Sequence, residues 1–392
     1  MTSFILTSYA DIPRLVSDKK YAKSKHLIVK KQKDLFIIKY NKSALNSENI
    51  LSLGLFRSVI TDGEKILSFS PPKSISPKFV AEKWAIDKLK LEEFVEGTMI
   101  NCFYHDGEWK IATRGNIGAQ CSFYQDNNKT FRDMFYEALA HIGWDINSLQ
   151  KDYSYSFILQ HPDNRIVVPF KEPNVVLAAV YEYDGWTVKE RSNIISDIKD
   201  SIPKTYINDV RNYFNTWDGI NAYFCSHNTP YYIVGVMIKC PDGTRSKLRN
   251  PVYEKVRNLK GNSPKIQYQY YYLYQQGLIK EFLKYYPEYN KSFWEYRNEL
   301  MEWTEQLWFL YKSRYIFKNI KDADIGYAFR PHVWFLHSLY LKEFRPENRR
   351  ITKNVVINYI YNLEPARLMY AINYPLRQKD KDDIKAETTA TH

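Results

Sequence analysis

The feature that most constrains this chain is a change of pattern near Pro264. Before it, short hydrophobic runs alternate with turn residues from about residue 25 to 260, which is typical of strands. The expected strands are LFIIKY, LFRSVI, GEKILSFS, GTMINCFY, GEWKIATRG, SYSFILQH, RIVVPF, VVLAAVYEYDGWTV and YYIVGVMIK. Asp-Gly pairs, a strong hairpin signal, lie between such runs at Asp62-Gly63, Asp106-Gly107, Asp184-Gly185 and Asp242-Gly243. The pattern predicts antiparallel sheet.

Helical spacing appears in both parts of the chain. In the first part it predicts helices at 76–89 and 129–144, and Gly143 suits a helix C-terminus. After Pro264, aromatic-rich helical segments cover 268–286, 292–317, 331–344 and 352–363. We therefore expect an α+β chain with a mixed domain at 1–263 and an all-helical domain at 264–377. The charged tail at 378–392 is expected to be disordered.

Composition narrows the class of partner. The net charge is +12 and the pI is about 9.1, which favours a polyanion, and nucleic acid is the natural candidate. A basic surface kept for solubility is the alternative. No apolar stretch long enough for a membrane span and no secretory leader are apparent, so we expect no membrane partner and a cytoplasmic location. Four scattered cysteines, Cys102, Cys121, Cys225 and Cys240, are expected to be buried, reduced thiols.

The most informative stretch is EEFVEGTMINCFYHDGEWKIATRGNIGA, residues 92–119. It resembles the nucleotidyl-lysine region of the RNA ligases typified by the tRNA-repair ligases of T-even phages. In that family a lysine precedes x-Asp-Gly-Ser, and a hairpin then leads to a basic residue and Gly-Ser. Glu96-Gly97-Thr98 and Arg114-Gly115-Asn116 match these two portions, whereas Phe94 stands where the lysine belongs.

Further segments resemble the same family in the same order, from about residue 30 to 262. Tyr40, Arg57 and Lys73 fall on upstream positions that help to hold the phosphates of the nucleotide. Pro162 and the run from Asn164 to Val167 match a later motif, and the closing Lys-x-Lys motif is matched by Lys247 and Arg249. Two family glutamates are replaced, by Ile158 and by Val234.

The resemblance implies an antiparallel-sheet nucleotidyltransferase domain, an ATP-grasp-like ligase, that joins RNA strands with ATP and Mg²⁺. In that reaction a lysine amine attacks the α-phosphate of ATP, a step that phenylalanine cannot perform. The missing glutamates would normally help to hold the divalent cation. The implied nucleotide- and phosphate-binding residues are Tyr40, Arg57, Lys73, Glu96, Gly97, Arg114, Lys247 and Arg249. The five cations among them, Arg57, Lys73, Arg114, Lys247 and Arg249, are expected to converge on one concave surface.

A relocated nucleophile is one alternative to a lost one. Lys39 lies on a strand that adjoins the expected pocket, but alternation sends Lys39 and Tyr40 to opposite faces. If Tyr40 points inward, Lys39 points away and is a solvated surface residue. The sequence itself identifies no catalytic residue and no metal ligand set.

Two functional hypotheses remain. One is an RNA ligase-like protein that binds RNA ends or ATP in a basic pocket. The other is an inactive pseudo-ligase that serves as an RNA-binding or assembly module, with a protein partner left open and no cofactor required. The residue usage is reminiscent of large DNA viruses of eukaryotes, which would place the protein in host cytoplasm or in the virion.

Some residues have a structural and a functional interpretation. The tyrosines of 268–274 could stack on RNA bases, but the favoured interpretation is that they pack helices together. His161, His332 and His337 lack the spacing of a metal or catalytic set and are read as structural. Asp322 and Asp324 are read as part of a solvated turn.

Overall fold

The computed structural model describes residues 2–123, 129–191, 194–198, 202–204 and 216–378. The chain divides into two compact units, residues 1–257 and 258–392, and each is described by itself. The tail expected to be disordered lies outside the described residues from position 379 onward. Among the helices of the described ranges, none combines the length and the apolar character needed to cross a bilayer.

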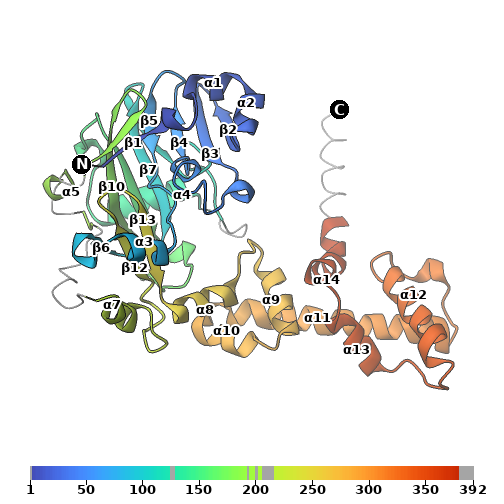
Figure 1. Ribbon diagram of the computed structural model, residues 1–392. Coiled ribbons are helices and arrows are strands. Elements are labelled where there is room, and N and C mark those ends of the chain that lie inside the picture. The colour runs from blue at the N-terminus through green and yellow to red at the C-terminus, as the bar shows by residue number, and fades with distance from the viewer. Residues whose placement is uncertain (1, 124–128, 192–193, 199–201, 205–215, 379–392) are drawn as a thin grey trace. The chain divides into compact units, whose positions relative to one another are not determined.

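Three antiparallel sheets form the first unit (Figure 1). The six-stranded sheet has the order β1 (Thr2–Ile5), β11 (Thr187–Glu190), β10 (Asn174–Asp184), β9 (Ser154–Gln160), β7 (Thr98–His105) and β8 (Glu108–Ala112). The four-stranded sheet contains β2 (Leu27–Gln32), β3 (Leu35–Tyr40), β4 (Val59–Thr61) and β5 (Ile66–Phe69). The three-stranded sheet has the order β13 (Arg245–Arg249), β12 (Gly235–Lys239) and β6 (Lys90–Glu93). The predicted antiparallel sheet is confirmed.

All four Asp-Gly pairs form the hairpins that they predict. They join β4 to β5, β7 to β8, β10 to β11 and β12 to β13, and each pair of strands is antiparallel. The four glycines have φ values from 58° to 107°, the region that residues with a Cβ avoid. These turns fix which strands are neighbours and therefore which side chains share a face.

Helices cover the sheets of the first unit. They are α1 (Ile12–Ser17), α2 (Lys19–Ser24), α3 (Pro77–Lys83), α4 (Phe131–His141), α5 (Ile194–Asp197) and α7 (Trp217–Phe224), and α8 (Pro251–Lys260) runs across the boundary of the two units. Thr130 and Asp133 form a capping box at the start of α4, and Gly143, at φ 64°, follows its end as expected. Phe135 of α4 packs on Phe157 of β9 in a buried core cluster.

Two predicted elements of this unit are wrong in part. The helix expected at 76–89 ends at Lys83, because Trp84 and Ala85 have extended backbones and a 3₁₀ turn, Ile86–Lys88, follows. The run RIVVPF, residues 165–170, is not a strand. Its amide groups at Val167 and Val168 donate to a side-chain carboxylate instead of a neighbouring strand.

The described elements of the second unit are helices. They are α9 (Ile266–Gln275), α10 (Ile279–Tyr285), α11 (Asn290–Tyr311), α12 (Arg330–Leu339), α13 (Lys353–Tyr361) and α14 (Pro365–Ile372), with π-helical turns at Lys312–Ile316 and Tyr340–Phe344. The segment 268–286 is two helices, because Gly277 has a φ of 68° and ends the first. Tyr270 and Tyr271 are fully buried, so these two tyrosines have the helix-packing role that was favoured over base stacking. Tyr272 is exposed.

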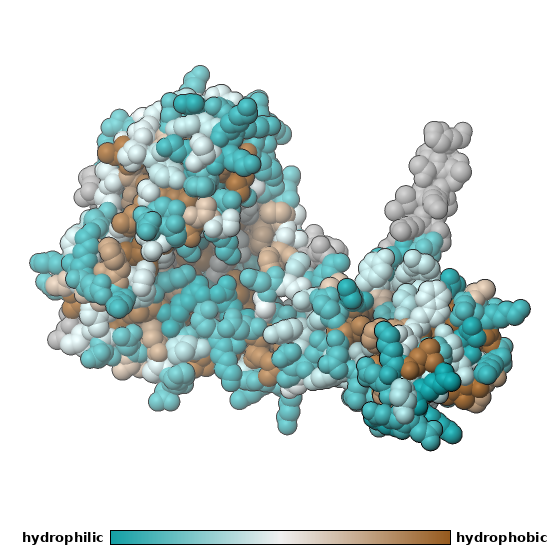
Figure 2. Space-filling model, turned by 45° about the vertical axis from the view of Figure 1, so that its right-hand side comes forward, coloured by the Kyte–Doolittle hydropathy of each residue, from teal (hydrophilic) through white to brown (hydrophobic). Residues whose placement is uncertain are grey.

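Aromatic side chains also lie on the surface of this second unit. Trp294, Phe309, Tyr327, Phe335 and Tyr370 are each more than half exposed, and Figure 2 shows hydrophobic patches among hydrophilic ones.

Two polar residues singled out in the sequence have structural partners in this unit. The Nδ1 atom of His332 contacts the Tyr359 hydroxyl at 2.7 Å, in keeping with a structural role. The Asp322 carboxylate is held by Arg314 through two hydrogen bonds, so this turn is an ion-paired one.

Candidate nucleotide and phosphate site

A cavity of about 320 Å³ lies in the first unit, lined by residues of the six-stranded and the three-stranded sheets. This volume is at the lower end of the range for small-molecule sites. Its cationic lining consists of Arg57, Arg245, Lys247, Arg249 and Arg257. Apolar side chains, among them Phe94, Ile158, Val234 and Met237, form another part of the wall, and Glu92, Glu93 and Glu96 are the acidic members. Phe94, Ile158 and Val234, where the resemblance implies charged residues, therefore line the same cavity.

Strand alternation on β13 explains three of the five cations. Side chains at positions 245, 247 and 249 point to one face, toward the cavity. The intervening residues point the other way: the Ser246 hydroxyl donates to the Ile75 carbonyl at 2.9 Å, and Leu248 packs against a buried apolar cluster. A one-residue change of register would remove the whole cationic row from the cavity.

Phe94 contacts the cations of β13, and Gly235 lies between them. Its backbone N–H donates to the carbonyl of Gly235 at 3.3 Å, and Gly235 pairs with Arg249 on the next strand. The Phe94 ring then lies under two cations, with the Arg249 guanidinium carbon 5.2 Å and the Lys247 amine 5.9 Å from its centroid. A Cβ at position 235 would lie 2.0 Å from the Leu248 carbonyl oxygen, and φ is +133°, so only glycine fits here.

The turn that follows Phe94 is fixed by Glu96 and Gly97. Glu96 is 5% exposed, and its Oε1 accepts the N–H groups of Val167 and Val168 at 3.0 Å each. Gly97 has a φ of +155°, and a Cβ there would lie 2.4 Å from the Leu159 carbonyl oxygen. Glu96 therefore holds the turn to segment 165–170, and Gly97 allows it to pack closely on β9. Together they fix the position of this wall of the cavity.

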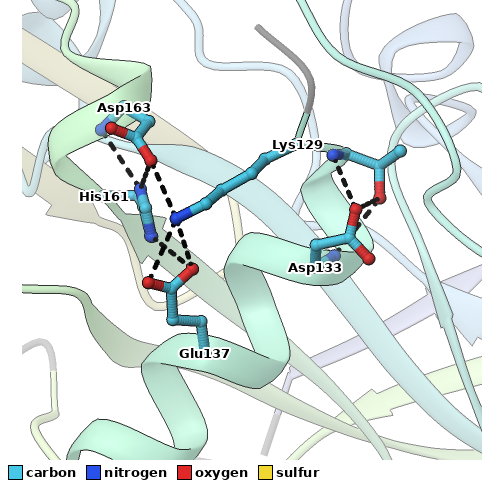
Figure 3. Close-up of polar contacts among 6 residues, drawn as sticks. Lys129, Asp133, Glu137, His161 and Asp163 are labelled. Carbon is cyan, nitrogen blue, oxygen red and sulfur yellow. Dashed lines mark hydrogen bonds and ion pairs between the residues drawn. The ribbon is translucent and has the colours of Figure 1, made fainter.

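A polar cluster, drawn in Figure 3, holds the loop residues that precede segment 165–170. His161 is 2% exposed; its Nδ1 accepts the Asp163 N–H at 3.1 Å, and its Nε2 lies 3.3 Å from Oε2 of Glu137 on α4. The amine of Lys129 bridges Glu137 at 2.9 Å and Asp163 at 3.0 Å. The expected structural role of His161 fits this arrangement, which joins α4 to the loop after β9.

Two of the three acidic residues that line the cavity, Glu92 and Glu96, have partners, and so does Glu254 beside it. Glu92 pairs with Lys90 at 3.1 Å and with Lys239 at 3.0 Å, and Glu96 is held by backbone amides. Glu254 pairs with Arg249 and lies 3.5 Å from Arg257. In the described ranges of the chain, the side chains of Arg57, Lys73, Arg114, Arg245 and Lys247 form no ion pair with a carboxylate. Among the described residues, Glu93 is the lining carboxylate without an ion pair, and burial raises its pKa, so positive charge predominates in this region.

The cations consequently perturb one another. Burial, followed by the charges of Arg245 and Arg114, lowers the pKa of Arg57 to about 10. Burial, then Arg249, Lys73 and Arg57, lowers the pKa of Lys247 to about 8. The pKa of Lys73 is lowered as well, by burial and then by Arg57 and Arg114. Like charges held this close cost free energy that a bound anion would recover.

Three of the residues implied by the resemblance lie close to the cavity but are not part of its lining. The Arg114 guanidinium carbon lies 4.6 Å from the centroid of the Tyr40 ring, and its Nε donates to the Arg57 carbonyl at 3.1 Å. Tyr40 is buried and its N–H donates to the Phe56 carbonyl, so it supports the segment that carries Arg57. Lys73 donates its backbone N–H to Gly54 on the same segment.

Lys39 does not line the cavity either. Tyr40 is buried and Lys39 is half-buried, so the two neighbours differ in environment as strand alternation requires. The Lys39 amine lies near Gly115, 3.2 Å from where a Cβ on that glycine would be.

Sequence reasoning missed Arg245, Arg257 and Tyr253 as lining residues. The signal for Arg245 was present, because the alternation Arg-x-Lys-x-Arg puts it on the face of Lys247 and Arg249. Arg257 and Tyr253 come from α8, which follows β13 directly. Their approach depends on the direction of that helix, which no local pattern encodes.

Comparisons with known proteins point to RNA ligases. No family model matches the chain. A stretch of 104 residues is 36% identical to an RNA ligase of Rhodothermus phage RM378, and it spans 24% of this chain and 24% of that ligase. A solved mutant of the Naegleria gruberi RNA ligase with ATP and manganese is 14% identical, covering 48% of this chain and 58% of that one, with a TM-score of 0.35.

A second solved structure, an archaeal ATP-dependent RNA ligase, is 13% identical, covers 93% of this chain and 78% of that one, and has a TM-score of 0.38. The expected similarity to RNA ligases is thus confirmed in the coarse sense that a phage RNA ligase shares part of the sequence. The narrower assignment to the T-even type stays a prediction.

Proposed function

We propose that this chain is an RNA ligase-like protein whose cationic cavity binds the phosphates of ATP or of an RNA 5′ end, with ATP-dependent strand joining as its activity. The observation that carries the proposal is the row of cations on β13 in a cavity that Arg57 also lines and where Glu92 is paired with lysines and Glu96 with backbone amides. Guanidinium and ammonium groups in such a setting are the usual partners of phosphate oxygens.

Unsatisfied donors fit the same ligand. Within the described residues, Nε and Nη1 of Arg245 and Nε of Arg249 are buried and have no hydrogen-bond partner. A buried polar group without a partner costs free energy, so these N–H groups favour an anion with several acceptor oxygens. A triphosphate or a terminal RNA phosphate supplies such oxygens, and Phe94 and Met99 offer apolar surface beside them.

A protein-held magnesium ion fits less well. Among the residues that the structure describes, no three His, Cys, Asp or Glu side chains come together to hold a metal. Ile158 and Val234 occupy the places of two family glutamates, and Glu92 and Glu96 are committed to other partners. We therefore assign no metal ligands, and any Mg²⁺ would arrive bound to ATP.

The apolar replacements favour a second candidate, a pseudo-ligase that binds RNA without joining it. Phe94, Ile158 and Val234 line one cavity, so the three replacements act on one site. Under this candidate the cavity still binds phosphate but forms no covalent intermediate. RNA remains the partner in both cases, and a protein partner is not required by either.

Filter binding of a short RNA with and without a 5′-phosphate tests the shared claim. The variant carries Arg57→Ala, Lys247→Ala and Arg249→Ala. Losing three phosphate contacts should weaken binding for every RNA sequence, and the slope of log affinity against log salt should fall by about 0.7 to 0.9 per contact. The 5′-phosphate should increase the affinity of the wild type only.

A matched control removes three charges elsewhere. Lys19, Lys20 and Lys23 are exposed on α2, where alanine is a good helix former. Their triple replacement by alanine lowers the net charge equally and should leave the 5′-phosphate preference intact. If both triple variants lose affinity to the same extent, binding is a property of net charge and the cavity is not the site.

A further inference from the structure

Lys247 is the one lysine among the described residues that line the cavity. The other four cations are arginines, which stay charged and cannot act as nucleophiles. Its amine lies on the side of the cavity occupied by Phe94, 5.9 Å from the ring centroid. It has no carboxylate partner in the described part of the chain, because Glu254, the nearest acid on α8, pairs with Arg249 and Arg257.

From this arrangement we propose that Lys247 supplies the amine that Phe94 cannot, so that the cavity forms a covalent nucleotide adduct on β13 instead of at the start of β7. The inference rests on the proposed function, because it needs ATP in the cavity. It favours the active ligase over the pseudo-ligase, because a pseudo-ligase forms no covalent adduct.

The reaction balances with ATP as the only co-substrate. The lone pair of the neutral Lys247 amine forms a nitrogen–phosphorus bond to the α-phosphorus, and the bond from that phosphorus to the bridging oxygen breaks. The electron pair leaves on pyrophosphate, and the proton of the amine passes to solvent. The product is a phosphoramidate that carries AMP.

The surroundings of Lys247 favour a neutral amine. Burial lowers its pKa most, and the charges of Arg249, Lys73 and Arg57 lower it further against the opposing charge of Glu254, to about 8. Across the sheet it faces Met237 and then Glu92, whose carboxylate is held by Lys90 and Lys239. The neutral amine is the form of lysine that acts as a nucleophile, and a pKa near the working pH makes that form abundant.

The position of Lys247 in the cavity, in addition to its charge, distinguishes it from other lysines that could act as the nucleophile. Lys73 and Lys39 are outside the lining, and Lys239 is committed to Glu92 and Glu190. Arg249 and Arg57 flank Lys247 and can hold the phosphates on either side of the one that is attacked. The ring of Phe94 gives this side of the cavity an apolar wall, with its centroid 5.9 Å from the amine.

The test uses the full chain, ATP labelled at the α-phosphate and Mg²⁺, followed by denaturing electrophoresis and peptide mass spectrometry. Equilibrium dialysis of ATP is run in parallel, so that binding and reaction are measured separately. The variants are Lys247→Arg, which keeps the positive charge, and Lys189→Arg, a control on the β10–β11 hairpin whose lysine pairs with Asp184.

We expect label on Lys247 in the wild type and in the Lys189→Arg control, and a loss of at least about 100-fold in Lys247→Arg with ATP affinity retained. Excess pyrophosphate should remove the label, since it reverses the step. Acid should release AMP and alkali should not, as expected for a nitrogen–phosphorus bond.

Three results would overturn the inference. ATP binding without any adduct leaves the proposed binding function standing and makes the protein a pseudo-ligase. Label on a different residue, such as Lys39 or Lys73, moves the nucleophile elsewhere. Absence of ATP binding rejects the ATP part of the proposed function and this inference with it.

Discussion

The pH dependence of ATP binding follows from the pKa of Lys247 and can be worked out in advance. That pKa is about 8, so the amine is mostly charged at pH 7 and mostly neutral at pH 9. A bound triphosphate prefers the charged form, because a positive charge stabilises the anion. Affinity therefore decreases as the pH rises through the pKa of the free protein.

The magnitude follows from the charged fraction. If only the protonated amine contributes, the charged fraction falls about tenfold between pH 7 and pH 9, so the dissociation constant should rise about tenfold, or about 1.4 kcal/mol. Arg57, whose pKa is lowered to about 10, keeps most of its charge in this window and adds little.

Isothermal titration calorimetry of ATP at several pH values measures this effect. Lys247→Arg is the matched variant, since arginine stays charged throughout, and it also corrects for titration of the nucleotide. It should retain its affinity to within about twofold over the same range. Equal slopes for wild type and variant, or a rise in wild-type affinity with pH, would refute the assignment of the low pKa to a phosphate-binding Lys247.

Stability predictions test the parts that shape the cavity. Gly97→Ala should destabilise the first unit by about 3 kcal/mol or more in urea denaturation, because of the backbone clash and the positive φ, and a change below about 1 kcal/mol would argue against this turn. Glu96→Ala should cost about 2 to 4 kcal/mol by the same assay, since two buried N–H groups lose their acceptor, and an unchanged midpoint would contradict that role. Thr130→Ala should lower stability by about 1 kcal/mol through loss of the capping box, whereas Thr130→Ser should retain most of it.

Local signals predicted much of the sheet topology. Each Asp-Gly pair fixed a hairpin because glycine supplies a positive φ that few other residues tolerate, and these hairpins align β7 with β8 and β12 with β13. The position of Phe94 could be anticipated for the same reason, since Glu96 and Gly97 mark the turn before β7. The resemblance then directed attention to Lys247 and Arg249.

Other features depend on partners far away in the sequence. Residues 165–170 have a strand-like composition, yet their amides bind Glu96, about 70 residues earlier, which no hydrophobic pattern reveals. Helix 76–89 breaks at Trp84, whose side chain packs against the cluster around Ile75 and Val236. Tyr40 and Arg114 support Arg57 from outside the cavity, and that difference between lining and supporting residues requires coordinates.

A crystal structure of the chain with ATP would show directly whether the cations of β13 and Arg57 bind phosphate. We expect phosphate density within hydrogen-bond distance of Arg57, Lys247 and Arg249, with acceptor oxygens facing Nε and Nη1 of Arg245. Phosphates bound at another surface while this cavity contains only water would contradict it.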